Sequence, residues 1–147
     1  MGKQKMSLIQ QSPFGSEIQA QDVIETMSRF SAWEDRYRQV IQWGKQLPVL
    51  ADEYKTELVK VAGCESEVWL VADQIDGIWH FAGDSDARIV KGLIAIVFAA
   101  LNNKSAAEIA AFDIDNYFSQ LGLLAHLSPS RGNGLKAIVE QIKGLVE

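Results

Sequence analysis

The sequence has little cysteine, histidine and proline, and each shortage narrows the possible functions. Of the 147 residues, one is cysteine, two are histidine and three are proline. One cysteine cannot form an intrachain disulfide, and the cysteine and histidine side chains are too few for a structural zinc site, which takes four. A lone thiol is typical of a reducing compartment. We therefore expect a cytoplasmic protein that binds no metal.

The sequence also lacks a long apolar segment, a secretory leader and the common nucleotide-binding motifs. The longest apolar run covers residues 92–101, whereas a helix needs ~20 apolar residues to cross a bilayer. Neither GxGxxG nor GxxxxGKS/T is present. The formal net charge is −5, from 14 basic and 19 acidic side chains, and phosphate binding requires clustered basic residues. We expect no membrane span, no nucleotide cofactor and no nucleic-acid partner.

The negative charge is concentrated in one part of the chain. Residues 51–86 contain nine acidic side chains and two lysines, a net charge of −7. The single cysteine, Cys64, lies in this stretch with Glu65 and Glu67 close by. Such a stretch is usually a solvated face, and it is alternatively a docking surface for a basic partner. Both interpretations stay open, with Glu65 and Glu67 as the candidate docking residues.

Hydrophobic periodicity predicts an α+β domain in which helices precede and follow a small antiparallel sheet. A loosely ordered N-terminal arm is expected over residues 1–20 and a single domain over residues 21–147. Two predicted strands, at residues 68–72 and 78–81, flank the hairpin signal Asp76-Gly77. Helices are predicted at residues 21–29, 31–46, 87–101, 105–111, 117–121 and from 128 towards the C-terminus. Residues 49–61 fit either a short helix or a loop.

Capping residues mark the expected helix starts. Two capping boxes are predicted, at residues 31–34 and 105–108. Asp84 and Asp86 precede the helix at 87–101, where carboxylates can cap the first turn and interact favourably with the helix dipole. This helix is apolar nearly all round, so we expect it at the centre of the fold.

Cys64 is the one nucleophile that the sequence singles out. It follows a glycine on a predicted loop, directly before a strand, and loops held by rigid elements often carry reactive groups. An inert buried cysteine is the alternative. Glu65 and Glu67 should raise the pKa of a neighbouring thiol. A thiol that reacts only when a partner activates it fits both features.

Five blocks of sequence resemble the SufE family in order and spacing. They are WEDRY at 33–37, GKQLP at 44–48, GCESEVW at 63–69, GDSD at 83–86 with IVKG at 89–92, and LSPSR at 127–131. The resemblance extends from about residue 14 to the C-terminus. The Pro13-Phe14-Gly15 segment is more similar to the CsdE branch of the family.

This resemblance implies an α+β fold related to the U-type iron-sulfur scaffolds, and a sulfur acceptor that needs no bound cofactor. A pyridoxal-phosphate cysteine desulfurase would form a persulfide, and Cys64 would take its terminal sulfur and relay it to a downstream acceptor protein. The chain would act as a sulfur-transfer partner rather than as a stand-alone enzyme. Lacking further cysteines, it should not assemble a cluster itself.

The resemblance also gives supporting roles to three residues. Asp86 matches a family aspartate near the cysteine loop, where it would support the loop or cap a helix. Arg131 matches the arginine of the LSPSR block, where it would pair with acids of the loop or of the partner, or lie at the surface. His126 would tune the thiol or be an ordinary surface histidine. A different class of function also stays open, namely a non-covalent binding module with an acidic docking face and an incidental cysteine.

Overall fold

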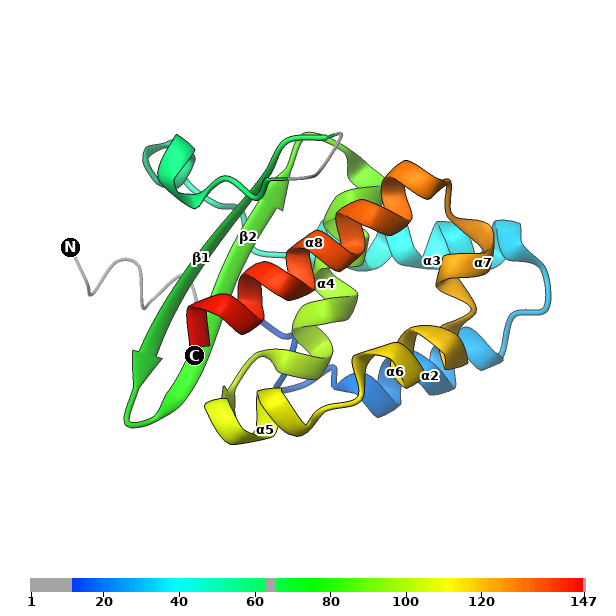
Figure 1. The fold of residues 1–147 in the computed structure, drawn as a ribbon. Helices are drawn as coiled ribbons and strands as arrows, with labels where there is room; N and C mark the ends of the chain where they lie inside the picture. Colours follow the sequence, from blue (N-terminus) through cyan, green and yellow to red (C-terminus); the bar gives the residue numbers. More distant parts are fainter. Residues whose placement is uncertain (1–11, 63–65, 147) are drawn as a thin grey trace.

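The computed structural model describes residues 12–62 and 66–146, which form helices around a three-stranded antiparallel sheet. The elements in chain order are α2 Ala20–Ser28, α3 Trp33–Gln46, the 3-10 turns η1 Asp52–Tyr54 and η2 Glu57–Val59, β1 Val68–Ile75, β2 Ile78–Ser85, α4 Arg88–Leu101, β3 Lys104–Ser105, α5 Ala106–Ala111, α6 Ile114–Leu121, α7 Leu123–His126 and α8 Pro129–Val146. Figure 1 shows the long β1–β2 hairpin on one side of the molecule and α3, α4 and α8 on the other. The α+β prediction is confirmed.

The hairpin forms around the predicted turn and is longer than predicted. Asp76 and Gly77 have φ angles of 52° and 80°, as a two-residue turn that matches the twist of the strands requires. Each strand is eight residues long, because the ladder continues through residues with little strand propensity, such as Asp73 opposite His80. A third, two-residue strand pairs Ile78 with Ser105 and was not expected from the sequence.

Helix α4 forms the centre of the core, as predicted. All of its 14 residues are buried except Arg88 and Lys91. It contacts α3, α8, α2 and β2. The backbones of α3 and α4 are in close contact where Gly44 of α3 faces Gly92 of α4. A Cβ on Gly44 would lie 2.7 Å from the Gly92 nitrogen. Within the described ranges, no helix combines the length and the apolarity needed to cross a membrane.

One of the two predicted capping boxes forms. Glu108 N–H donates to the Ser105 hydroxyl at 3.2 Å, and Ser105 N–H donates to the Glu108 carboxylate at 3.0 Å. These hydrogen bonds lower the pKa of Glu108. The box predicted from Ser31 is wrong: α3 has Ala32 at its N-cap and no side-chain cap. Ser31 stands one residue too early for its hydroxyl to take that position.

The N-terminal segment is attached to the core through Asn102. Residues 1–11 of the expected arm lie outside the described residues, whereas Phe14 is fully buried. The Asn102 amide donates to the Phe14 carbonyl at 2.9 Å, and its oxygen accepts from Phe81 N–H at 2.8 Å. Phe14 is therefore packed into the core and held there by Asn102.

Candidate functional site

We call residues 62–67 the cysteine loop; of these the structure describes residues 62, 66 and 67, and residues 66 and 67 directly precede β1. Val61 N–H donates a hydrogen bond to the Val68 carbonyl at 2.8 Å, which joins the two sides of the loop. The candidate residues Cys64 and Glu65 lie outside the described residues. The site is therefore defined by the groups that flank the loop and by those that surround it.

The C-terminal side of the loop is fastened through the backbone of Glu67. Glu67 N–H donates to Asp86 Oδ1 at 3.1 Å. The Glu67 carbonyl accepts from the Ser85 hydroxyl at 2.7 Å and from Asp86 N–H at 3.3 Å. Helix α4 begins two residues after Asp86, so these bonds tie the cysteine loop to the start of the central helix.

The predicted capping of α4 by Asp84 and Asp86 is wrong. The N-cap residue is Ala87, and no side chain caps it. β2 continues to Ser85, so Asp84 is still paired with Trp69 in the ladder. The Asp86 carboxylate accepts from Glu67 N–H, and the Ser85 hydroxyl accepts from Ala87 N–H at 3.2 Å.

Asp84 is instead a buried carboxylate held by two lysines. Its side chain is 7% exposed and lies 3.2 Å from Lys55 Nζ and 3.4 Å from Lys91 Nζ. Burial alone would lower the pKa of Lys55, but the hydrogen bond and the charge of Asp84, with the charge of Asp52, outweigh it and raise the pKa. Lys55 also lies 5.3 Å from the centre of the Trp69 ring. These contacts hold the segment that contains η1 against β1, β2 and α4.

Lys60 neutralises part of the acidic stretch beside the loop. Its Nζ lies 3.2 Å from Glu67 Oε1 and 3.9 Å from Glu57 Oε1. The hydrogen bond to Glu67, followed by the charges of Glu57 and Glu67, raises the pKa of Lys60. Glu67 is thus engaged in an ion pair with Lys60, so its carboxylate is not a free acidic group for an approaching partner.

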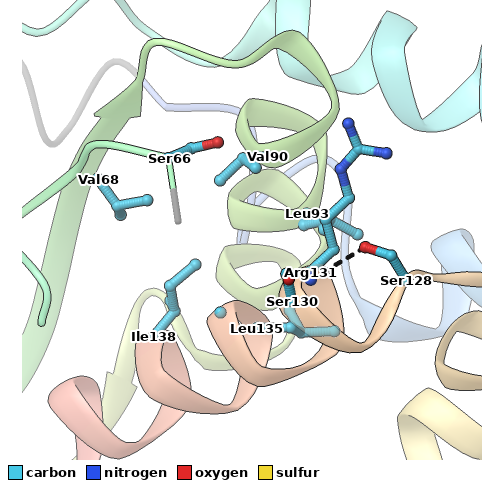
Figure 2. A pocket seen from close by; sticks show the side chains of 10 residues that line it. Ser66, Val68, Val90, Leu93, Ser128, Ser130, Arg131, Leu135 and Ile138 are labelled. Carbon is cyan, nitrogen blue, oxygen red and sulfur yellow. Dashed lines mark hydrogen bonds between the residues drawn. The ribbon is translucent and has the colours of Figure 1, made fainter. Parts of the chain in front are cut away.

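A cavity of about 430 Å³ opens next to the cysteine loop. It is lined by residues in β1, α4 and α8 and by two serines just before β1 and α8: Ser66, Val68, Val90, Leu93, Ser128, Ser130, Arg131, Gly134, Leu135 and Ile138. In Figure 2, Ser66 and Arg131 lie on opposite sides of the cavity, and the Arg131 side chain extends away from Leu135 and Ile138. The volume is in the range of small-ligand sites, ~300–1,000 Å³, and the lining combines aliphatic side chains with three serines and Arg131.

Of the predicted supporting residues, Arg131 lies at this cavity and His126 does not line it. Arg131 N–H donates to the Ser128 hydroxyl at 3.3 Å, as expected for Ser128 at the start of α8. Its guanidinium forms no ion pair within the described part of the chain. The exposed His126 ring stacks on Trp33 with a centroid distance of 4.5 Å, which joins α7 to α3.

Lys55 and Ser66 were not expected at the site. No local sequence pattern predicts a role for either residue, because each reaches the site through tertiary packing. Lys55, for example, forms an ion pair with Asp84, which is 29 positions away in the chain. Among the described residues, no group of three or more His, Cys, Asp or Glu side chains could hold a metal ion.

The chain is similar to known proteins over most of its length. Residues 21–146 match the SufE family, described as the Fe-S metabolism associated domain. The sulfur acceptor protein CsdE of Escherichia coli (strain K12) is 47% identical over 133 residues, which are 88% of this chain and 89% of CsdE. A SufE-like protein of Rhizobium etli is 49% identical over 125 residues, which are 82% of this chain and 84% of that protein.

The fold is also found in a solved structure. The solution structure of a hypothetical protein from Thermus thermophilus superposes with a TM-score of 0.70 at 19% identity, covering 86% of this chain and 92% of that one. This likeness concerns the fold alone, whereas the family match and the identity to CsdE concern the sequence. The chain therefore belongs to the SufE family, in its CsdE branch.

Proposed function

We propose that this chain is a sulfur acceptor that takes persulfide sulfur from a pyridoxal-phosphate cysteine desulfurase onto Cys64. It thereby stimulates the desulfurase, and it relays the sulfur in the cytoplasm to a downstream acceptor protein for iron-sulfur cluster assembly or related sulfur trafficking. The observation that carries this proposal is the identity to the sulfur acceptor protein CsdE over 88% of the chain, in a sequence with one cysteine.

The transfer is a thiol exchange in which atoms and charge balance. The Cys64 thiolate attacks the outer sulfur of the desulfurase persulfide, and a new sulfur–sulfur bond forms as the old one breaks. The desulfurase cysteine leaves as a thiolate, and Cys64 carries the persulfide. The total number of sulfur–sulfur bonds is unchanged, so no external oxidant or reductant is needed.

The surroundings of the loop support this role. Ser66, which follows Cys64 by two positions in the chain, lines the cavity. Arg131 adds a cation at the cavity, and a nearby cation favours a thiolate or a persulfide anion. We assign loop support to Asp86, a secondary tuning role to His126, and contact with the desulfurase to Glu65 and Glu67.

Mass spectrometry of the intact chain tests the proposal. After incubation with a cysteine desulfurase and cysteine, the chain should gain one sulfur atom at Cys64, and a thiol reductant should remove it. A non-covalent binding module would dock to the desulfurase without this gain. A chain that binds the desulfurase but never gains mass would reject the acceptor function in favour of that alternative.

Asp86 should affect how fast Cys64 is loaded. The Asp86→Ala variant loses the acceptor for Glu67 N–H, so the loop is less well positioned and loading should slow ~3–10-fold, because small displacements of a reacting group reduce rates strongly. Stability should change by less than ~1 kcal/mol, since this hydrogen bond is exposed. Loading is followed by quenched-time mass spectrometry.

The matched control for Asp86 is Asp86→Asn, which keeps Oδ1 as an acceptor and removes the charge. If the hydrogen bond positions the loop, Asp86→Asn should load at close to the wild-type rate. Equal slowing in both variants would show that the charge of Asp86, and not its hydrogen bond to Glu67, matters for transfer.

A further inference from the structure

A second, smaller cavity lies between the end of α3 and the start of α4 and is surrounded by cations. It has a volume of about 180 Å³ and is lined by Ile41, Gly44, Lys45, Arg88 and Lys91. The close backbone contact of Gly44 with Gly92 brings these helix ends together. Three cationic side chains thus converge in a chain whose net charge is −5. We call this site the cationic cavity.

Two of the three cations form no ion pair with a described residue. Lys91 shares the buried Asp84 with Lys55, but neither Lys45 nor Arg88 forms an ion pair within residues 12–62 and 66–146. Like charges around one small cavity repel each other. An anion in the cavity would remove this repulsion.

Helix stability explains Lys45 but not Arg88. Lys45 lies in the last turn of α3, where a cation interacts favourably with the helix dipole. Arg88 is the first residue of α4, where a cation is unfavourable. That turn contains no acidic residue and no side-chain cap. Arg88 is therefore placed against the electrostatic preference of its own helix, and an external anion is the partner that would compensate it.

The cationic cavity is close in the chain to the anchor of the cysteine loop. Asp86, which accepts from Glu67 N–H, is separated from Arg88 by one residue. Asp84 links Lys91 of the cavity to Lys55 beside β1. A protein that reaches Cys64 would therefore cover or border this cavity.

We propose that the cationic cavity receives a carboxylate side chain of the cysteine desulfurase and so strengthens the binding of the two proteins; this rests on the proposed function. A guanidinium is suited to pairing with a carboxylate through two parallel hydrogen bonds. The cavity is smaller than the ~300–1,000 Å³ of small-molecule sites, so it suits one side-chain group. With the cationic cavity and the acidic residues Glu65 and Glu67, the surface that we propose for desulfurase binding would contain charges of both signs.

The test compares Arg88→Glu with a matched control, Arg29→Glu. Arg29 is an exposed arginine at the end of α2, outside both cavities. Direct binding to the desulfurase, stimulation of its turnover and sulfur loading are measured at several salt concentrations, together with thermal unfolding. Arg88→Glu should weaken binding ~10-fold or more. It should also make the affinity less dependent on salt concentration, because a charge at the interface contributes to affinity and is screened by salt. Maximal stimulation and loading at saturation should stay unchanged, and Arg29→Glu should bind like the wild type.

The proposal is overturned if the two variants bind equally well, or if Arg88→Glu reduces loading at saturation. If Arg88→Glu unfolds at lower temperature, the neutral Arg88→Gln replaces it, and normal binding by a stably folded Arg88→Gln would also overturn the proposal. Inorganic phosphate that binds the wild type but not Arg88→Glu, with desulfurase binding unaffected, would identify a small-anion site instead. If the wild-type chain binds the desulfurase without gaining sulfur, the sulfur-acceptor function is rejected. The proposal about the cationic cavity can still be tested, because the comparison of Arg88→Glu with Arg29→Glu measures affinity and does not depend on sulfur transfer.

Discussion

Replacing Cys64 by serine should reduce the stimulation of desulfurase turnover to the level measured without this chain. A serine hydroxyl is nearly isosteric with a thiol, but it is not ionised near neutral pH and cannot accept sulfur by thiol exchange. The effect should be complete rather than partial, because the chain contains no second cysteine to substitute. The measurement is the rate of alanine or sulfide release at saturating Cys64→Ser.

Two measurements separate loss of chemistry from loss of structure in Cys64→Ser. The thermal unfolding temperature and the affinity for the desulfurase should both match the wild type, because docking is assigned to charged groups around the loop. Full stimulation by a folded Cys64→Ser would show that the chain acts on the desulfurase through binding alone. That result would favour the non-covalent module with an incidental cysteine.

Gly92→Ala should strongly destabilise the fold. A Cβ at position 92 would overlap the Val40 carbonyl oxygen, so α3 and α4 would have to separate where their backbones touch. Overpacking a rigid core typically costs about 1–3 kcal/mol. For a chain of this length, at ~3 °C per kcal/mol, that corresponds to a loss of about 3–9 °C in unfolding temperature. Urea and thermal unfolding monitored by circular dichroism measure both quantities.

Gly144→Ala is the matched control for Gly92→Ala, because both glycines are in helices. Nothing lies within 4 Å of a Cβ at position 144. Alanine there should be neutral or stabilising by up to ~1 kcal/mol, since it has the higher helix propensity. If Gly92→Ala unfolded at the same urea concentration as Gly144→Ala, the close approach of α3 and α4 would not limit stability.

The ion pairs change how the acidic stretch should be interpreted. From the sequence, residues 51–86 have a net charge of −7, which suggests a bare acidic surface. In the fold, Lys60 pairs with Glu57 and Glu67, and Asp84 is buried between two lysines. Part of the negative charge therefore stabilises the loop and its surroundings, and the contribution of Glu67 to docking must compete with its ion pair.

Local signals were reliable where a short segment contains both partners of an interaction. Asp76-Gly77 supplied the two positive φ angles of the hairpin, and Ser105 with Glu108 formed a complete capping box. The same reasoning failed where a more distant contact competed for the residue. Asp84 and Asp86 have the composition of helix caps, but the extension of β2 to Ser85 directs them to other partners.

The sequence by itself determined the central apolar helix, the hairpin, the family blocks and the choice of Cys64, because each depends on periodicity or on residues adjacent in the chain. The tertiary structure alone decided which contacts the groups around the loop make. Asp86 reaches Glu67 across 19 positions, and Arg131 of α8 faces the same cavity as Ser66 near β1. Such contacts depend on how helices pack on the sheet, and no local pattern of side chains encodes that geometry.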